Sequence, residues 1–482
     1  MASAGIQNPM VTAVAGGGMT DPLDAITPLD GRYASSTAPI RPYASEAALM
    51  RARARIEVEY LIALADLDAL PISFDAGDRS TLQGWIEGFS DEDAAQIKQI
   101  EVEGTADRPA TNHDVKAVEY WLRDRLIEAD LEAAVPYAHF GLTSEDVNNL
   151  AYRLLLRGAI EEELLPTLST LITRMTEEAI DHRQVAMLSR THGQPASPTT
   201  YGKELAVFVR RLTRGRARLD HRISELEGKL GGATGTFAAH AIAEPDVDWP
   251  AVARSFVEEL GLQYAPLTTQ VNPNDDIAAV FDALAEIATT MIDFNRDMWR
   301  YISDDYLVQE RAAGEVGSST MPHKVNPIDF ENSEGNLQKA RSDLRFLADT
   351  LPISRLQRDL SDSTVHRTMG GALAHWYLGI TKADAGLASV APHPETMEAA
   401  LADAPAVLAE AVQSALRRIG DPDAYERLKE ATRGQQVTAD DFDELIDEIR
   451  TVDPVLADRL SNLTPATYVG LAPILTDELN RE

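Results

Sequence analysis

One segment of this chain carries an unusually long helical pattern of hydrophobic residues. From Asp276 to Tyr306, apolar side chains recur every three or four residues, which places them along one face of a helix. Such a helix would be about 30 residues long, well beyond the common length in globular proteins. Because a single helix cannot hide so long an apolar stripe from water, the segment predicts a bundle of long helices.

Other parts of the chain supply candidate partners for this helix. The same pattern predicts helices over about 162–183, 201–230, 336–350 and 363–388. Several of their apolar stripes are wide, so helices from other subunits are expected to complete the bundle. Strand signals are few and short, at 187–189 and 264–267. A coiled-coil scaffold is the alternative, but many Gly and Pro residues separate the helices.

The predicted fold is all-α and has three parts behind a tail. Residues 1–20 are small, polar and Gly-rich, which predicts a disordered tail. An N-terminal helical domain is expected over 21–141, a central helix-bundle domain over 142–388 and a C-terminal helical domain over 389–482. Ser144-Glu145-Asp146 resembles a helix start at the first boundary, and Pro392 with Pro394 marks the second.

Charge restricts the partners of this chain. Its 77 acidic residues against 44 basic ones give a formal charge of −33. Such a field repels nucleic acids and anionic membrane surfaces, so neither is expected as a partner. The excess also indicates adaptation to a salt-rich cytoplasm, where salt screens self-repulsion; an ordinary acidic enzyme is the alternative. A small anionic substrate stays possible if local Arg and Lys residues override the field.

The chain contains no cysteine, which rules out disulfides, thiolate metal sites and cysteine nucleophiles. Its N-terminal residues do not form a secretory signal, and no stretch approaches the ~18 apolar residues of a membrane span. Patterns typical of zinc proteases, nucleotide-binding loops, serine hydrolases and calcium loops do not occur. We therefore expect a cytoplasmic protein with no metal site.

The segment from Gly317 to Pro327 is the strongest candidate for chemistry. Its glycine allows a loop to move over a ligand. Ser318 and Ser319 offer a nucleophile or proton acceptor, and Lys324 and Asn326 can hold developing negative charge. The alternative is a surface loop whose Ser and Gly residues only make turns.

A histidine lies in a second tight connection, Thr191-His192-Gly193-Gln194-Pro195, before the helix predicted from residue 201. An imidazole in such a place can face a cleft and exchange protons near neutral pH. Capping of a helix by the ring is an equally good interpretation of this spacing alone.

Two predicted helix starts could bind anions. Asn112, or Thr111 before it, is expected to cap a helix that brings His113 and its backbone amides to a ligand. Thr143 and Ser144 open the next helix in the same way. Capping alone would explain both motifs.

Arginines supply local positive charge in an acidic setting. Arg32 with Tyr33, Arg358, and the segment 363–367 are the candidates. Planar guanidinium groups suit oxyanions better than ammonium groups do. A structural salt bridge with a nearby Asp is the competing interpretation for Arg358.

Residues 317–327 and the continuation Ile328-Asp329-Phe330-Glu331-Asn332-Ser333-Glu334-Gly335-Asn336 resemble the shared loop of the fumarase/aspartase superfamily, in its bacterial-type adenylosuccinate lyase branch. The resemblance runs from Leu29-Asp30-Gly31-Arg32-Tyr33 to Pro465-Ala466-Thr467-Tyr468-Val469-Gly470. It implies a three-part all-α fold with a central long-helix bundle shared in a homotetramer, composite active sites, a nucleotide substrate and no cofactor.

The resemblance also implies roles for individual residues. His192 would be the general acid and Ser318 the base, although chemistry alone does not choose between Ser318 and Ser319. Lys324 and Asn326 would stabilise the carbanion, and Arg32, Tyr33, Ser363 and Arg367 would hold the phosphate. The implied substrate-binding residues are Arg32, Tyr33, Asn112, His113, Asp114, Thr143, Ser144, Gln270, Ser319, Lys324, Val325, Asn326, Asn332, Arg358, Ser363, Thr364, Val365, His366 and Arg367.

The implied reaction is elimination of fumarate from adenylosuccinate to give AMP, and from the succinylated aminoimidazole carboxamide ribotide. Another fumarate-producing lyase, for argininosuccinate or aspartate, is the closest alternative and would need no phosphate-binding site. A non-catalytic structural relative is a second alternative, although Ser318, His192 and Lys324 are all present.

Overall fold

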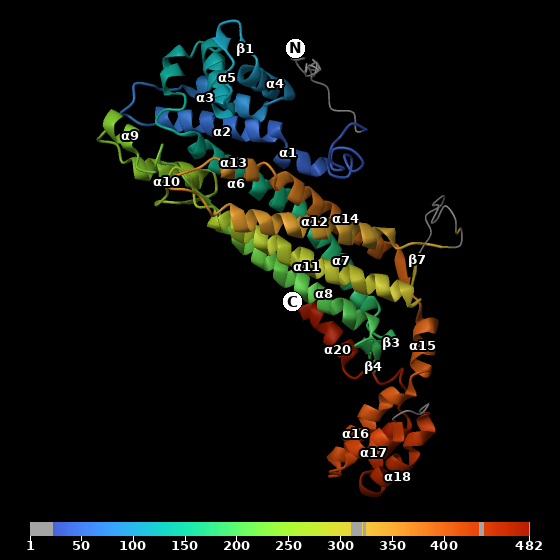
Figure 1. Cartoon of the computed structure of the whole chain (residues 1–482). Helices are drawn as coiled ribbons and strands as arrows, with labels where there is room; N and C mark the ends of the chain where they lie inside the picture. Colours follow the sequence, from blue (N-terminus) through green and yellow to red (C-terminus); the bar gives the residue numbers. More distant parts are fainter. Residues whose placement is uncertain (1–22, 310–320, 322–323, 433–437, 482) are drawn as a thin grey trace, which may run out of the picture.

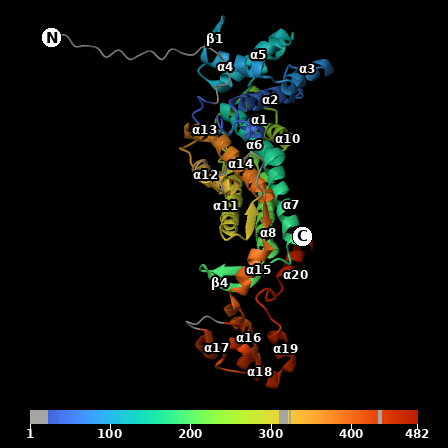
Figure 2. The same cartoon turned by 90° about the vertical axis from the view of Figure 1, so that its right-hand side faces the viewer.

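The computed structural model describes residues 23–309, 321, 324–432 and 438–481. In the described residues the chain is predominantly helical and elongated, with a helical unit at either end of a long central bundle (Figures 1 and 2). The prediction of an all-α fold in three parts is therefore confirmed. The tail predicted for residues 1–20 lies outside the described residues.

The N-terminal unit packs short helices around one long one. Its elements are a 3-10 helix Ala38–Ile40, α1 (Arg41–Ala44), α2 (Glu46–Ala65), α3 (Ala76–Glu87), α4 (Asp91–Val102), the strands β1 (Gly104–Thr105) and β2 (Arg108–Pro109), α5 (Asp114–Glu128) and a 3-10 helix Glu132–Tyr137. Helix α2 lies at the centre and contacts α3, α4, α5 and α6. Ser45 caps it by accepting a hydrogen bond from Ala48 N.

The central part contains the long helices and short hairpins at their ends. Its elements are α6 (Ser144–Ala159), a π-helix Ile160–Leu164, α7 (Leu165–Asp181), β3 (Ala186–Thr191), β4 (Gln194–Thr200), α8 (Tyr201–Ser224), β5 (Glu227–Gly228), α9 (Ala238–Ala243), α10 (Trp249–Glu259), β6 (Gln263–Tyr264), α11 (Asp275–Ser303), β7 (Leu307–Gln309), α12 (Ile328–Thr350), α13 (Ser361–His366), α14 (Met369–Ala388) and β8 (Val390–Pro392). Strands β3 and β4 form an antiparallel hairpin, β5 pairs with β6 in parallel, and β7 pairs with β8.

Five of these helices form a closed ring. Each packs on two neighbours in the order α7, α8, α11, α12, α14 and back to α7. Trp376 of α14 is fully buried, and its indole N–H donates to Leu284 O of α11 at 3.1 Å. Gly379 lets α12 and α14 approach closely, because a Cβ there would lie 2.5 Å from Leu337 Cγ. The predicted bundle therefore has its core between these five helices.

The C-terminal unit has a small core of its own. Its elements are α15 (Pro394–Ala402), a 3-10 helix Pro405–Leu408, α16 (Ala409–Arg418), α17 (Ala424–Thr432), a 3-10 helix Ala439–Phe442, α18 (Asp443–Val452), α19 (Pro454–Ser461), α20 (Ala472–Thr476) and a 3-10 helix Asp477–Arg481. Helices α16 to α19 share one apolar cluster, which includes Leu416 and Ile449. The chain then returns to the bundle, because α20 packs against α8 (Figure 1).

Several predicted helix bounds were wrong. The helix predicted from residue 336 begins at Ile328 instead. The prediction started too late because Ser333 and Asn336 are buried polar residues, which interrupt the apolar pattern although the helix continues through them. The helix predicted to residue 230 ends at Ser224. Leu226 and Leu230 are buried as expected, but they belong to the segment around β5.

Three further bounds differ from expectation. The helix predicted over 363–388 is split into α13 and α14 by a turn at Arg367 and Thr368, where Thr368 Oγ1 donates to Val365 O at 2.8 Å. The helix predicted over 162–183 is a π-helix followed by α7. The strand predicted over 264–267 reaches only Tyr264, and Leu267 is exposed.

Candidate active site

The start of α5 places His113 at the edge of the candidate site. His113 itself is the N-cap, because its Nδ1 accepts a hydrogen bond from Lys116 N at 3.2 Å. The prediction that Asn112 or Thr111 caps this helix was wrong. Asn112 has a positive φ of 49°, which turns the chain before the helix begins. With Nδ1 occupied as an acceptor, His113 Nε2 faces Ser144 Oγ at 3.5 Å.

The start of α6 lies beside it and is held by a capping contact. Asp146 Oδ2 accepts a hydrogen bond from Thr143 N at 2.8 Å, which confirms the predicted capping box. Gln270 reaches this helix start from the loop before α11, and its Nε2 donates to Thr143 Oγ1 at 3.0 Å. Ser144 follows Thr143 as the first residue of α6. Two helix N-termini therefore meet here, an arrangement that favours anions.

Two arginines face this region from the segment around α13. Arg358 Nη2 donates to Ser363 Oγ at 2.9 Å and pairs with Glu145 Oε1 at 2.9 Å. Arg367 Nη2 pairs with Asp114 Oδ2 at 2.8 Å. The predicted salt bridge of Arg358 with a nearby Asp is present, since its Nε lies 3.9 Å from Asp362 Oδ1, but Glu145 is the closer partner. Both guanidinium groups keep further N–H donors.

The carboxylates that hold these arginines have shifted pKa values. Burial acts to raise the pKa of Asp114, but the Arg53 charge, the Val115 backbone N–H and Arg367 outweigh it, so the pKa lies below its ordinary value. Burial raises the pKa of Glu145, and the Arg358 charge offsets this only in part. Asp114 is therefore ionised at neutral pH, whereas burial disfavours the ionised form of Glu145.

Three neighbouring candidates on α13 differ in their exposure. Thr364 is exposed. Val365 and His366 are buried, and the His366 ring stacks on Tyr152 with centroids 4.5 Å apart. Its Nδ1 lies 3.0 Å from Asp362 O. Any contact of these two buried side chains with a ligand would thus require opening of the packing.

In the predicted Arg32–Tyr33 pair, Tyr33 contacts α12. Arg32 is exposed, and Tyr33 Oη accepts a hydrogen bond from Asn332 Nδ2 at 3.4 Å. The preceding residues line a cavity of about 560 Å³ together with Arg367 of the α13–α14 turn. The structure therefore brings this segment to the border of the arginine cluster.

His192 lies far from that cluster within one chain. It occupies the two-residue turn of the β3–β4 hairpin, where His192 and Gly193 have positive φ values of 52° and 77°. This confirms the predicted tight connection, and the ring is exposed. The hairpin and α13 lie at opposite ends of the bundle in both views (Figures 1 and 2).

The catalytic-loop candidates are described only in part. Ser318 and Ser319 lie outside the described residues. Lys324, Val325 and Asn326 lie before α12, where Gln309 Nε2 donates to Val325 O at 3.1 Å. This end of α12 is next to β7, at the end of the bundle opposite α13 (Figure 1).

Comparison with known proteins places the chain in a family. A family model described as lyase matches residues 31–341, and one described as adenylosuccinate lyase C-terminal matches residues 354–469. The adenylosuccinate lyase of Haemophilus influenzae is 43% identical over 462 residues, covering 95% of this chain and 99% of that protein. The Escherichia coli enzyme is 43% identical over 460 residues, with the same coverage. The Dictyostelium discoideum enzyme is 40% identical over 469 residues, covering 94% and 97%.

The chain belongs to the adenylosuccinate lyase family. It is thus a lyase of the fumarase/aspartase superfamily, which confirms the resemblance inferred from the sequence. Solved structures agree on the fold. A 3-carboxy-cis,cis-muconate lactonizing enzyme from Pseudomonas putida has a TM-score of 0.70 at 22% identity, covering 91% of this chain and 95% of that one. A fumarate lyase from Mesorhizobium sp. has a TM-score of 0.70 at 20% identity, covering 91% and 96%.

The sequence did not predict the buried side chains that hold the carboxylate partners of Arg358 and Arg367. Arg53 of α2 is 2% exposed and pairs with Asp114 Oδ2 at 2.9 Å. Asn148 of α6 donates to Glu145 Oε1 at 2.8 Å. The available signal was a charged residue within an otherwise apolar stripe, since Arg53 lies between the buried Met50 and Ile56.

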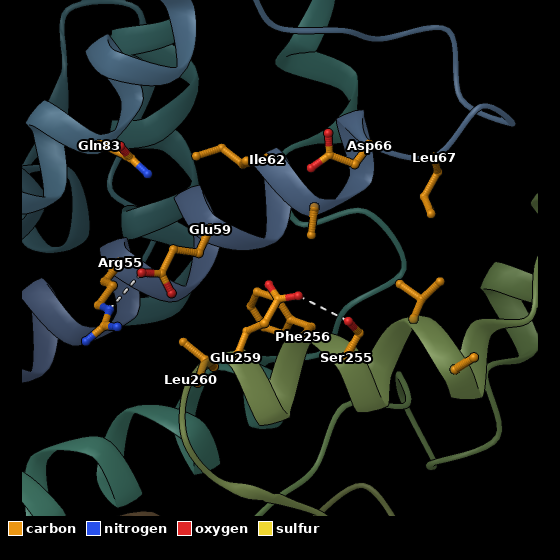
Figure 3. A pocket seen from close by; sticks show the side chains of 13 residues that line it. Arg55, Glu59, Ile62, Asp66, Leu67, Gln83, Ser255, Phe256, Glu259 and Leu260 are labelled. Carbon is orange, nitrogen blue, oxygen red and sulfur yellow. Dashed lines mark hydrogen bonds and ion pairs between the residues drawn. The ribbon is translucent and has the colours of Figure 1, made fainter. Parts of the chain in front are cut away.

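A separate cavity of about 590 Å³ lies between α2 and α10 (Figure 3). Its walls carry an Arg55–Glu59 contact of 2.9 Å and a Ser255–Glu259 contact of 3.1 Å. None of the predicted site residues is among those that line it. This cavity is therefore distinct from the arginine cluster.

Within residues 23–309, 321, 324–432 and 438–481, no group of three or more His, Asp or Glu side chains is placed to hold a metal ion. Over the same part of the chain, no helix combines the length and the apolar character needed to cross a membrane.

Proposed function

We propose that this chain cleaves adenylosuccinate to AMP and fumarate, and that it performs the same elimination on the succinylated aminoimidazole carboxamide ribotide of purine nucleotide biosynthesis. The observation that carries this proposal is the cluster of Arg358, Ser363 and Arg367 beside the N-termini of α5 and α6. In a lyase of this family, such a cluster suits the phosphate of a nucleotide.

The cluster also favours adenylosuccinate over the substrates of the alternative lyases. Argininosuccinate and aspartate carry carboxylates but no phosphate, so they would leave part of this positive charge unused. Arg32 and Tyr33, which approach from the N-terminal segment, are assigned to the same phosphate. Thr143 and Ser144 at the start of α6 are assigned to a carboxylate of the succinyl group, with Gln270 beside them.

The proposed chemistry is a β-elimination by acid–base catalysis. A base, assigned to Ser318, removes a proton from the carbon beside a carboxylate, and the electron pair delocalises into that carboxylate. Lys324 and Asn326 stabilise the added negative charge. The C–N bond then breaks, the double bond of fumarate forms, and His192 donates a proton to the departing nitrogen. A serine hydroxyl is a weak base, so its alkoxide needs backbone amides and Lys324 nearby.

We propose that each active site is composite and belongs to a homotetramer. The β3–β4 hairpin, whose turn contains His192, and α13 lie at opposite ends of one bundle, so a single chain in this conformation does not bring His192 to the arginine cluster. A second copy packed along the bundle would place one end against the other. Exposed hydrophobic side chains on three bundle helices support such packing: Val207 on α8, Trp299 on α11 and Phe346 on α12 are each more than 40% exposed.

We also place the enzyme in the cytoplasm of a cell with high internal salt. A chain without cysteine is suited to a reducing compartment. The charge of −33 per chain is the feature that favours high salt, because only concentrated counterions screen it at short range.

A direct assay tests the function. Purified protein mixed with adenylosuccinate is expected to change the ultraviolet absorbance as AMP and fumarate form, in the presence of a metal chelator. The His192→Ala variant is the matched control and should show no comparable change. Turnover of argininosuccinate or aspartate, with adenylosuccinate left intact, would replace the proposal with one of its alternatives.

A further inference from the structure

A continuous chain of side-chain contacts runs beneath the site and joins its two arginines. On the first side, Arg358 Nη2 pairs with Glu145 Oε1 at 2.9 Å. Asn148 Nδ2 donates to that same oxygen at 2.8 Å. Arg53 Nε then donates to Asn148 Oδ1 at 2.8 Å. Glu145, Asn148 and Arg53 are all buried, so these contacts are shielded from water.

On the other side, Arg53 reaches the second arginine through a shared carboxylate. Arg53 Nη2 pairs with Asp114 Oδ2 at 2.9 Å, and Arg367 Nη2 pairs with the same oxygen at 2.8 Å. The two guanidinium groups differ in exposure, since the Arg53 side chain is 3% exposed and the Arg367 side chain 49%. Arg53 is thus the interior partner, and Arg367 is the one that a ligand can reach.

The geometry of Arg53 requires a guanidinium group. Its Nε and Nη2 atoms donate in two directions at once, to Asn148 on α6 and to Asp114 at the start of α5. The planar fork of arginine holds these donors at a fixed separation, whereas a lysine ammonium is a single point of charge. A buried arginine is also costly unless its donors are satisfied, so both contacts are tightly defined.

The charges show a second effect of Arg53. Arg53, Asp114 and Arg367 together carry one net positive charge. Without Arg53, Asp114 and Arg367 would neutralise one another. The interior arginine therefore lets Arg367 keep attraction for an anion while Asp114 still fixes its position.

We propose that Arg53 is a positioning residue that presets Arg358 and Arg367 as one clamp for the phosphate of the nucleotide. It acts through Asn148 and Glu145 on one side and through Asp114 on the other. Arg53 itself is buried and does not touch the ligand. The inference rests on the proposed function, because it names the phosphate as the group that is clamped.

A purely structural role would give a different pattern of effects. Arg53 joins α2 to α5 and α6, so its loss would lower stability whether or not it positions the clamp. Only positioning would weaken a phosphate-bearing ligand more than the same ligand without phosphate. AMP and adenosine form such a pair.

The test compares the binding of AMP and adenosine to the full-length protein by calorimetry, together with KM and kcat for adenylosuccinate. Arg53→Lys keeps the charge but loses the two-directional contact. It is expected to weaken AMP binding roughly tenfold to a hundredfold and to leave adenosine binding within about twofold. KM should rise more than kcat falls, because the phosphate lies away from the bond that breaks.

Two further variants complete the design. Asn148→Ala breaks the network without removing a charge, and it should weaken AMP binding in the same selective way even if Arg53→Lys folds poorly. Arg125→Lys is the matched control, since Arg125 joins α5 to α4 through Asp93, outside the network. Its AMP affinity should be unchanged.

Equal AMP affinity in the unaltered protein and the network variants would overturn the proposal, as would equal losses for AMP and adenosine. These outcomes are separate from the test of function. If the unaltered protein binds AMP but does not cleave adenylosuccinate, the proposed function fails, and the affinity comparison still decides the role of Arg53.

Discussion

Asp146 and Lys229 form an ion pair in which neither side chain is exposed, with Oδ1 and Nζ 2.7 Å apart. Asp146 also accepts hydrogen bonds from Gly231 N at 2.8 Å and Thr143 N at 2.8 Å. Lys229 Nζ donates to Gly232 O at 2.8 Å. The pair thus holds the glycine turn after β5 against the start of α6, where Thr143 belongs to the candidate site.

Lys229→Met should therefore destabilise the protein strongly. Removing the ammonium leaves the Asp146 carboxylate buried without its partner, a change that typically costs about 3–5 kcal/mol. Denaturant unfolding measures this free energy. Lys98→Met is the control, because Lys98 pairs with Glu46 at the surface and should contribute no more than about 1 kcal/mol. Similar losses in the two variants would contradict the special role of the buried pair.

Complementation between variants tests the proposed composite site. Ser318→Ala and His192→Ala are each expected to reduce turnover by roughly 10²–10⁴-fold, the usual contribution of acid–base groups. When the two inactive proteins are mixed and reassembled, some sites should combine intact copies of both residues from different chains. Partial recovery of adenylosuccinate cleavage is the expected result.

Mass measurements must show that mixed oligomers form in this experiment. Recovery near zero in verified mixed oligomers would place both residues of a site on one chain. Near-normal turnover in Ser318→Ala alone would move the base to Ser319 or another group.

His366 should make the fold sensitive to acid. Burial lowers its pKa from 6.5 to about 4, because the packed ring, stacked on Tyr152, resists charge. Above pH 6.5 the ring is neutral in both the folded and the unfolded chain, so this stability is fully present. As the pH falls from 6.5 to about 4, the unfolded chain binds a proton that the folded chain does not, and about 3 kcal/mol is lost.

The measurement is the free energy of unfolding across this pH range. His366→Gln has no ring to titrate, so its stability should fall less steeply than that of the unaltered protein between pH 6.5 and 4. The carboxylates titrate in both proteins, so their contributions cancel when the two free energies of unfolding are subtracted. Parallel curves would show that His366 does not contribute.

Salt should act oppositely on assembly and on substrate binding. At −33 per chain, repulsion between chains is strong in dilute buffer. The Debye length falls from about 30 Å at 0.01 M to about 3 Å at 1 M, so molar salt screens nearly all of it. Melting temperature and oligomer size should therefore rise with KCl, while KM for adenylosuccinate also rises because salt weakens its attraction to the arginines.

Thermal unfolding and sedimentation from about 0.05 M to about 3 M KCl provide the measurement. Sodium sulfate at matched ionic strength separates screening from the general strengthening of apolar burial. A flat or falling melting temperature would remove the proposal of a salt-rich cytoplasm and leave the lyase function untouched.

Helical periodicity predicted the bundle well because long apolar stripes have few structural solutions. The helix predicted from Asp276 is α11, which begins one residue earlier. Periodicity did not predict where helices end, since Leu226 is buried just beyond α8 in the same way as residues within it. Nor did it predict that His113 would cap α5, because that choice depends on the positive φ of Asn112.

For the candidate site, the sequence alone determined the residue types and the family, because short motifs such as Thr191-His192-Gly193-Gln194 retain their chemistry whatever surrounds them. Only the tertiary structure decided which side chains meet. Arg53 and Arg367 are more than 300 positions apart in the chain, yet they share one oxygen of Asp114. That contact depends on how α2, α5 and α13 pack, and packing arises from the burial of many apolar residues together rather than from any local pattern.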